Sequence, residues 1–527
     1  MRKGCWLAAV FIVFSVGFAW RIEDQPLASA WVDPVGRIAA QDEAVYSHIA
    51  TGMARNGDWM TPRFMGRYAL FKPPLLHWLT AASVRLLGRS NLSYRAPSIL
   101  SAAAAATLAV AWALHWSPWA ALAVGMLLAG NPWLHTLARL NLMDALLTFL
   151  FTAAAWTLRR DPSLTKIQSR VLFGFWVAAG IMTKSVAGVL PLLMLGVFWL
   201  VARSEHRPPV AALGQVLGVS VLLAAPWHLY QLFQHPHWFW AEYIIDEHFR
   251  SALAPLSQTS QEGHVAFYLR RWVATDPVLL VLLLAAIPHA ARELKRRTSP
   301  EWIILLSWLA IGIGAVLAFQ YRNLAYLLPV APAAALIGVG GALRRPRILY
   351  AAVAFLAVAL GARIANPSAP WGLSFAPTAP LPSRHCLEEY ARQQRGRELI
   401  IAMPDDEFYS SLLPLPRVRY VFADDGRERQ HPAMDFRFLG ITVSTDEFLN
   451  LTPWRPIFHN RLRSFDMDSD EPIATVIQIR NQADVRRLIE GAPGADFFLP
   501  AGWAAVVPPN RRILSCSSGR LFVLALP

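Results

Sequence analysis

The sequence predicts a polytopic α-helical membrane protein of about eleven transmembrane helices, followed by a C-terminal soluble α/β domain. The first observation is composition: 55% of the 527 residues are hydrophobic and only 16% are charged. A soluble globular protein has about 45–50% apolar and about 25% charged residues. The mean hydropathy of +0.35 agrees. Three cysteines in this length exclude a disulfide scaffold.

The second observation is where the charge lies. The net charge is +14, and residues 1–365 carry 31 Lys and Arg against 16 Asp and Glu, whereas residues 366–527 carry 18 against 19. The basic excess therefore belongs to the apolar part. Basic residues beside an anionic membrane face explain this placement. A nucleic-acid surface would need a basic soluble domain.

Eleven apolar runs approach the length of about 20 residues that a membrane-spanning helix needs. They are residues 4–20, 96–116, 119–134, 142–158, 171–183, 187–201, 212–226, 272–290, 302–319, 324–343 and 348–364. The first run could instead be a signal peptide, because a charged start precedes it and the small residues Ala28, Ser29 and Ala30 follow it. Its apolar stretch is longer than the usual ~7–15 residues, which favours an uncleaved anchor.

With eleven spans, five groups of basic residues fall on one side of the membrane. Cytoplasmic loops carry the excess of Lys and Arg, so this side is the cytoplasm. Loops 21–95 and 227–271 and the tail from residue 366 then lie on the periplasmic side of a bacterial inner membrane. The basic groups are Arg2 and Lys3; Arg159, Arg160, Lys166 and Arg170; Arg203 and Arg207; Arg292, Lys295, Arg296 and Arg297; and Arg344, Arg345 and Arg347.

The tail changes character at a Pro-, Ala- and Ser-rich linker over residues 366–382. Short apolar runs at 399–403, 418–422, 473–479 and 521–526 predict strands, and 386–394 and 483–490 predict helices. We therefore divide the chain into a membrane domain, 1–365, and an α/β domain, 366–527. Cys386 and Cys516 are the only thiols of the tail; they could pair or remain as two buried free cysteines.

Asp144 gives the sharpest functional signal. It is the first acidic residue after Asp58 and stands at the start of a predicted span. A carboxylate at a membrane boundary is costly unless it is paired, which makes it a functional candidate. The alternative is a structural ion pair with Arg139.

Asp42 and Glu43 form a second signal just beyond the first span, at the start of an amphipathic stretch that suits the membrane surface. Adjacent residues point about 100° apart on a helix, so one of the two at most faces a given site. Alone, such a pair is an ordinary feature of a protein surface.

Several cations are predicted on the same face of the membrane as these carboxylates. Each alone could be an interfacial residue whose charge reaches the headgroups. Together they predict a basic cavity suited to the phosphate of a lipid carrier. They are Lys72, Lys184, Arg250, Arg270 and Arg322.

The ordered motifs of residues 1–365 resemble the bacterial lipid-linked glycosyltransferases of the GT-C class, and most of all the aminoarabinose transferase-like family related to protein O-mannosyltransferases. In the first outer loop these are Asp42, Glu43, Tyr46, Gly57, Asp58, Trp59, Pro62, Lys72, Pro73, Pro74, Leu75 and Trp78. Further on they are Arg139, Asp144, Thr183, Lys184, Pro191, Pro226, Trp227, Glu247, His248, Arg322, Tyr326 and Pro329.

The resemblance implies a transferase that takes a sugar from a polyprenyl-phosphate donor, such as undecaprenyl phosphate, and gives it to a lipid A-like lipid, a glycan or a protein. Asp42, with Asp144 and Glu43, would form the catalytic group. Lys72, Arg322 and Tyr326, with Lys184 and Arg250, would hold the donor phosphate, and Arg139, His248 and Arg270 would line the cavity. The family often has Glu where this chain has Phe71, which puts an amino-sugar or metal role in question.

The chemistry of the residues agrees with a lipid-linked donor. Cations stabilise the departing phosphate, and Asp42 would deprotonate a hydroxyl acceptor or orient a phosphate acceptor, with inversion at the sugar carbon. The outer loops contain no glycine-rich nucleotide loop and no Asp-x-Asp pair. The sequence identifies no cofactor and leaves a divalent metal open. The alternatives are a flippase for an anionic lipid and an envelope assembly protein with an inert membrane part.

The topology yields the first prediction. A reporter that is active only in the cytoplasm, fused after Pro527, is expected to be silent, because the basic loops lie on the opposite side from the tail. The measurement is reporter activity in intact cells, with a fusion after Arg203 as the active control. Strong activity after Pro527 would mean that the number of spans is even.

Overall fold

The computed structural model describes most of the membrane part and separate stretches of the tail. The described residues are 2–25, 41–64, 67–236, 239–250, 263–319, 322–343, 345–375, 390, 397–403, 418–422, 436–438, 441–443, 464–466, 482–516 and 519–525. The predicted strand 473–479 and most of the predicted helix 386–394 lie outside them.

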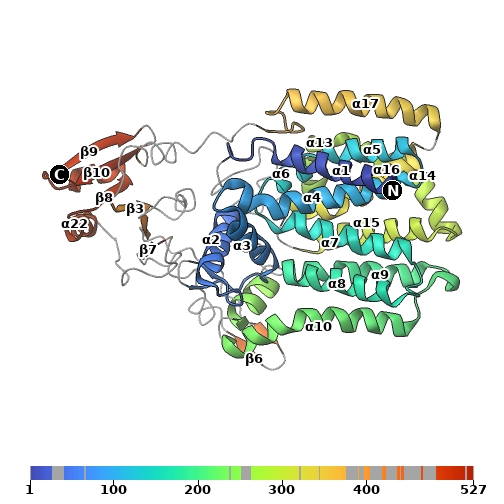
Figure 1. The fold of residues 1–527 in the computed structure, drawn as a ribbon, viewed down its shortest axis with the longest axis horizontal. Coiled ribbons are helices and arrows are strands. Elements are labelled where there is room, and N and C mark those ends of the chain that lie inside the picture. Colours follow the sequence, from blue (N-terminus) through green and yellow to red (C-terminus); the bar gives the residue numbers. More distant parts are fainter. Residues whose placement is uncertain are drawn as a thin grey trace.

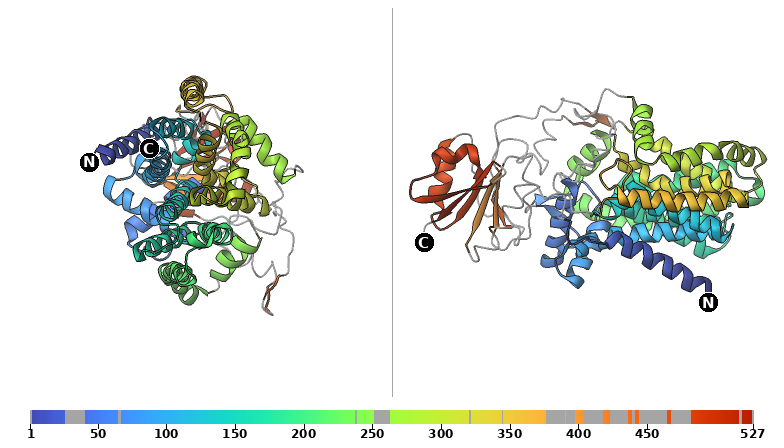
Figure 2. Two further views of the ribbon diagram at one scale, coloured as in Figure 1. Left: turned by 90° about the vertical axis from the view of Figure 1, so that its right-hand side faces the viewer. Right: turned by 90° about the horizontal axis from the view of Figure 1, so that it is seen from above.

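The membrane part is a bundle of roughly parallel and antiparallel helices (Figures 1 and 2). Its long elements are α1 (Arg2–Ala19), α4 (Asn91–Leu114), α5 (Pro118–Ala129), α7 (Met143–Arg160), α8 (Ile167–Lys184), α9 (Leu190–Val201), α10 (Val210–Gln234), α14 (Pro277–Arg296), α15 (Pro300–Ala318), α16 (Ala331–Ala342) and α17 (Pro346–Ala365).

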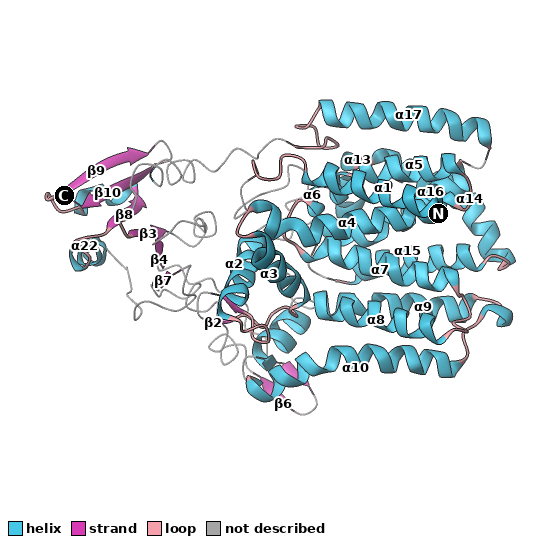
Figure 3. Ribbon diagram, viewed as in Figure 1, coloured by secondary structure: helices cyan, strands magenta, loops and turns pink. Residues whose placement is uncertain are grey.

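The shorter elements gather mainly at one end of this bundle, which we call the α2–α3 end (Figure 3). They are α2 (Gln41–Asn56), β1 (Arg63–Phe64), β2 (Arg67–Tyr68), α3 (Leu75–Leu87), α6 (Pro132–Ala138), η1 (Ser185–Val189), η3 (Phe239–Arg250), α13 (His264–Thr275) and η4 (Leu324–Val330). The short η2 (Ser204–His206) lies between α9 and α10.

Within the described residues, seven helical stretches are long and apolar enough to cross a membrane. An eighth is added if α5 and α6, which meet at 63°, form one bent span. This is fewer than the eleven expected. Each of the eleven expected segments does contain a helix, but several helices are short: α9 has 12 residues and α1 has 18.

One of the seven stretches, Ile167–Val201, contains a reversal of the chain. A Cβ built on Gly188 would lie 2.0 Å from the carbonyl carbon of Gly180, so the two backbones are in contact. Eight residues of a straight helix would separate them by about 12 Å. The stretch is therefore a hairpin of α8 and α9, and only glycine at position 188 permits its tight closure.

A buried ion pair ties α2 to the bundle. The Arg95 guanidinium donates to both carboxylate oxygens of Glu43, at 2.7 and 3.0 Å, and both side chains are fully buried. Arg95 also donates to the carbonyl of Gln25, and the backbone N–H of Asn141 donates to Glu43 at 2.8 Å. One pair thus joins α2, α4, the end of the α1 segment and the loop that precedes α7.

The tail contains a mixed six-stranded sheet in the order β7-β4-β3-β8-β10-β9. Its strands are β3 (Leu399–Met403), β4 (Val418–Phe422), β7 (Ser464–Asp466), β8 (Asp496–Pro500), β9 (Arg511–Cys516) and β10 (Arg520–Ala525), and a separate pair is formed by β5 (Phe436–Phe438) and β6 (Ile441–Val443). The central β3 runs parallel to β4 and β8, whereas β10 is antiparallel to β8 and β9.

The helix α22 (Gln482–Gly491) packs on this sheet through Val485 and Ile489, which share a core with Phe497 and Val523. Strands 399–403, 418–422 and 521–526 and helix 483–490 were expected, whereas β5, β6, β7, β8 and β9 were not. Cys516 is disulfide-bonded, and Cys386 lies outside the described residues. Cys5 is a free, exposed thiol.

The buried pair yields a prediction about stability. Arg95→Met should lower the free energy of unfolding by about 3–5 kcal/mol, because it leaves the Glu43 carboxylate buried without its counter-charge. The measurement is chemical denaturation in mixed micelles. The matched control is Arg21→Met, which removes an exposed pair with Asp24 at 2.7 Å and should cost about 0–1 kcal/mol. Equal effects of the two substitutions would contradict this assignment.

Candidate active site

Three of the predicted site residues meet at the α2–α3 end of the bundle. The Lys184 ammonium donates to Asp144 Oδ1 at 2.7 Å, and the same nitrogen lies 4.6 Å from the centre of the Tyr326 ring. Asp144 begins α7, Lys184 ends α8 and Tyr326 lies in η4. The side chains of Asp144 and Lys184 are 9% and 16% exposed. The two charged groups therefore have little contact with solvent, which strengthens the attraction between them.

The backbone after Lys184 is unusual and helps to place this lysine. Ser185 has φ of +46°, a left-handed value that is uncommon for a residue with a side chain. Such conformations cost free energy and concentrate at functional sites. The sharp turn between α8 and η1 presents Lys184 to Asp144.

Asp144 is held in place by the loop that precedes it. Asn141 accepts a hydrogen bond from Thr80 Oγ1 at 3.0 Å and donates to Ser47 Oγ at 3.1 Å. Ser98 Oγ donates to the carbonyl of Leu142 at 3.2 Å. Side chains from α2, α3 and α4 therefore fix the backbone just before the carboxylate.

Arg139 does not pair with Asp144, so the alternative of a structural ion pair between them is wrong. Its guanidinium donates to the carbonyls of Phe18 and Trp20, at 2.8 and 2.7 Å, and to Gln25 Oε1 at 3.1 Å. Its side chain is buried. Arg139 ties the end of α1 to the loop before α7 and does not line a cavity with the Asp144 cluster.

A second cluster lies around Lys72, which stands just before α3. The Lys72 ammonium pairs with the Glu247 carboxylate of η3, with side chains 14% and 26% exposed. His248, the next residue of η3, places Nδ1 against the carbonyl of Tyr243. Burial lowers the pKa of His248, and the charge of Lys72 lowers it further, so its imidazole is neutral at pH 7.

Tyr243, which is buried, lies beside His248 in the Lys72 cluster, with ring centroids 4.7 Å apart. Its hydroxyl is 2.6 Å from His228 Nε2. Burial raises the pKa of Tyr243 to about 12, so it stays protonated. The π-helix η3 that carries Tyr243 and Glu247 is a rare form often found at functional sites.

The other predicted residues have different environments. Asp42 is the second residue of α2, and its side chain lies outside the described ones, as does that of Arg250 at the end of η3. Arg322 is half-buried immediately before η4, whereas Arg270 is exposed on α13. Asn323, next to Arg322, is anchored to α13 by its backbone N–H, which donates to the Tyr268 hydroxyl at 3.2 Å.

Glu43 requires a correction. We expected it among the catalytic residues, but its carboxylate is enclosed by Arg95 and the Asn141 backbone and is fully buried. It is therefore a positioning residue for the loop that leads to Asp144.

Phe71, which stands where the family often has Glu, packs against the Tyr46 ring with centroids 6.3 Å apart.

Three contributors to the site were not predicted: Glu247, which pairs with Lys72; Tyr243, whose hydroxyl contacts His228; and Ser185, whose turn places Lys184. Glu247 had one signal, an acidic residue next to His248 in an outer loop. Ser185 had none, because its role depends on a turn that no residue pattern marks.

The arrangement has two ammonium groups, each held by a carboxylate, at one end of a membrane bundle. Such cations can accept a phosphate in exchange for a carboxylate, and the carboxylates can then act on the reacting sugar or its acceptor. Among the described residues, no three His, Cys, Asp or Glu side chains are grouped to hold a metal ion.

A family comparison matches part of the membrane domain. Residues 71–230, from before α3 to within α10, match the family described as dolichyl-phosphate-mannose-protein mannosyltransferase. This segment contains Lys72, Asp144 and Lys184.

Curated relatives share the same region. The chain is 28% identical over 305 residues to the undecaprenyl phosphate-alpha-4-amino-4-deoxy-L-arabinose arabinosyl transferase of Aeromonas salmonicida, which covers 56% of this chain and 54% of that protein. It is 26% identical to arabinosyl transferase 1 of Sodalis glossinidius over 349 residues, 64% of this chain and 59% of that protein. The chain thus matches about half the length of such relatives.

The fold is shared along the whole chain with a solved structure. The crystal structure of ArnT from Cupriavidus metallidurans bound to undecaprenyl phosphate has a TM-score of 0.65 and 17% identity, and the match covers 98% of this chain and 97% of that one. Its apo form has a TM-score of 0.62 and 16% identity. These matches confirm the resemblance that the sequence motifs indicated.

Proposed function

Because this multi-pass chain is a relative of the lipid-linked glycosyltransferases of the GT-C class, we propose that it transfers a sugar from a polyprenyl-phosphate carrier to an acceptor on the periplasmic face of a bacterial inner membrane. The observation that carries the proposal is the pair of cation–carboxylate contacts, Lys184 with Asp144 and Lys72 with Glu247, at one end of the bundle.

The proposed topology has eleven crossings, with the tail on the side of the α2–α3 end. Contacts at the opposite end of the bundle support it. Arg203, after α9, donates to the carbonyl of Arg296 at the end of α14. Glu301, at the start of α15, accepts from Arg159 at the end of α7 and from Trp116 after α4.

Other contacts join helix ends at the α2–α3 end of the bundle. Asp276, at the start of α14, accepts from Asn131 after α5 and from Arg363 at the end of α17. Asp144 and Lys184 place the start of α7 and the end of α8 at this end too. Each successive helix therefore begins where its predecessor ended, and the hairpin of α8 and α9 supplies two crossings.

In the proposed reaction, Lys72 and Lys184 bind the donor phosphate with Arg322, and Tyr326 supports Lys184 through its ring. Charge-assisted hydrogen bonds to phosphate are strong in a partly dry site. The same cations stabilise the charge that develops on the phosphate as the bond to the sugar breaks. Attack from the opposite face inverts the sugar carbon.

Two carboxylates can serve the acceptor. Asp42, at the start of α2, is proposed as the base for a hydroxyl acceptor or as the group that orients a phosphate acceptor. Asp144 is released when Lys184 turns to the phosphate, and it then stabilises positive charge at the sugar carbon. Glu43 and Arg139 hold the backbone that positions them.

The names of the curated relatives suggest an aminoarabinose donor, and we propose a lipid A-like acceptor by analogy. Phe71 stands where the family often has Glu, so this position gives no support for an amino group on the sugar. A flippase is less well supported, because transporters place their polar groups near the bilayer midplane. Here the two cation–carboxylate pairs lie at one end of the bundle.

Donor binding tests the phosphate site. Lys72→Met should weaken binding of undecaprenyl phosphate about 10–150-fold, because a hydrogen bond to a charged group contributes about 1.5–3 kcal/mol. Glu247→Gln should tighten it, because the competing carboxylate is weakened. The measurement is a titration of the purified protein in detergent, with Lys166→Met, at the opposite end, as control. Unchanged affinity in both Lys72→Met and Arg322→Met would remove the assignment.

Turnover separates catalysis from positioning. Asp42→Asn should lower the rate of sugar transfer about 10²–10⁴-fold if Asp42 is the general base. Its melting temperature should stay that of the parent. Glu43→Gln should instead lower the melting temperature, because Arg95 loses its buried counter-charge. The measurements are label transfer from a polyprenyl-phosphate sugar and thermal unfolding in the same detergent. If Asp42→Asn turns over within a few-fold of the parent, the base must be sought at Asp144.

A further inference from the structure

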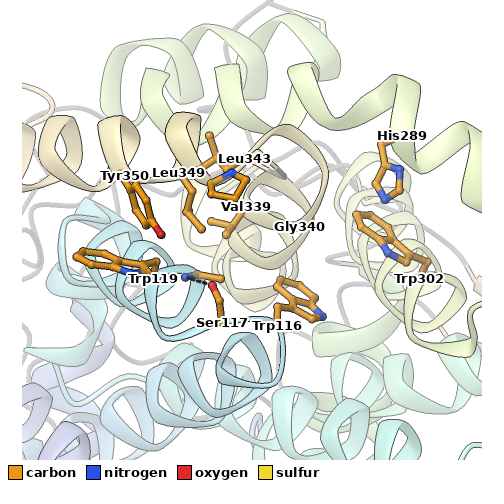
Figure 4. A pocket seen from close by; sticks show the side chains of 12 residues that line it. Trp116, Ser117, Trp119, His289, Trp302, Val339, Gly340, Leu343, Leu349 and Tyr350 are labelled. Carbon is orange, nitrogen blue, oxygen red and sulfur yellow. Dashed lines mark hydrogen bonds between the residues drawn. The ribbon is translucent and has the colours of Figure 1, made fainter.

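A cavity of about 420 Å³ lies at the end of the bundle opposite to the proposed active site (Figure 4). It is enclosed by the turn between α4 and α5, the end of α16, the start of α17, and side chains of α14 and α15. Its volume falls within the range of about 300–1,000 Å³ that ligand sites occupy.

Most of the residues that line the cavity are aromatic or aliphatic, and Ser117 and His289 add polar groups. Trp119 of α5 and Tyr350 of α17 stand edge to face with ring centroids 5.0 Å apart, and they are 45% and 49% exposed. Trp116 and Trp302 form the inner wall, where a Cβ on Gly340 would lie 3.0–3.3 Å from their rings. Trp and Tyr are typical of the level at which lipid headgroups meet acyl chains.

Cations surround the cavity where it reaches the end of the bundle. Arg345 and Arg347 flank the lining residue Pro346, and Arg292, Lys295 and Arg296 follow the lining residue His289 on α14; all five are exposed. The acidic residues near the cavity are engaged: Glu293 is 3.8 Å from His289, and Glu301 accepts from Trp116 and Arg159.

We propose that this cavity binds one anionic phospholipid of the cytoplasmic leaflet. An acyl chain would fill the space between Trp116, Trp119 and Tyr350, and the headgroup phosphate would contact Arg345 and Arg347. The cavity is mostly apolar, lies at the level of exposed Trp and Tyr side chains and is bordered by exposed cations. These properties match a lipid that is apolar at one end and anionic at the other. The site is independent of the transferase reaction.

The lipid would close a gap between α17 and the rest of the bundle. Few residues of α17 are buried, namely Leu349, Val353, Leu356 and Arg363, and only Leu349 lies in its first turn. Because α17 leads directly to the tail, a lipid bound against its first turn would fix the position of the helix that precedes the α/β domain.

The test measures retained lipid by native mass spectrometry after equal exposure to phosphatidylglycerol and phosphatidylcholine. The parent should retain one phosphatidylglycerol in several-fold preference to phosphatidylcholine. Val339→Phe fills the cavity and should abolish this retention, whereas Val358→Phe, at a position 72% exposed on α17, should not. Arg345→Gln with Arg347→Gln should remove the preference for the anionic lipid, and Arg203→Gln with Arg207→Gln should keep it.

A second readout covers variants that fold poorly. Phosphatidylglycerol should raise the melting temperature of the parent and of Val358→Phe but not that of Val339→Phe, since a ligand stabilises only the state that binds it. Glycerol phosphate should not displace the lipid. Equal retention of the two lipids, retention unchanged by Val339→Phe, or equal loss in the Arg203 and Arg207 control would each overturn the proposal.

Discussion

The buried contact between Arg95 and Glu43 is the constraint on which the arrangement of the site depends. Two charges removed from water are tolerated only because each is fully hydrogen-bonded, Arg95 also by backbone carbonyls and Glu43 also by the Asn141 N–H. The same carboxylate therefore holds α2, which begins with the proposed base, and the loop that ends at Asp144. A single pair thus fixes the backbone of α2 relative to the loop before Asp144.

The sequence predicted the ends of the helices and the charged residues at them better than it predicted the partners of those residues. Asp144 stood out because a carboxylate at a membrane boundary is costly, and Lys184 and Tyr326 were expected near it. Its pairing with Lys184 and not with Arg139 could not be inferred, because an arginine and a lysine are equally able to reach a carboxylate. The outcome depends on the turn at Ser185 and on the contact of Gly180 with Gly188, which are properties of two packed backbones.

The same reasoning explains the errors over Glu43 and the spans. The helical pattern predicts that Asp42 and Glu43 point in different directions, but it does not predict which of the two points into the protein core. Hydropathy located all eleven apolar segments, yet only seven or eight described stretches satisfy the length and composition of a span. Short helices such as α9, with 12 residues, fall below the length of a span when they are judged one at a time. In the tail, β8 and β9 were not predicted because their apolar runs are short: β8 has three apolar residues between Asp496 and Pro500, and β9 has only Ile513 and Leu514 after two arginines.

Each of the two lysines of the proposed phosphate site is paired with a carboxylate. In the proposed reaction, a phosphate that binds both lysines must replace Glu247 at Lys72 and Asp144 at Lys184, so separating the existing pairs offsets part of its electrostatic attraction. The donor gains affinity only if the displaced carboxylates find new partners. For Asp144 the proposed new partner is the sugar carbon as it becomes positive, which exists only while the bond to phosphate is breaking. An interaction that is absent from the bound ground state and present in the transition state accelerates the reaction and does not merely tighten binding.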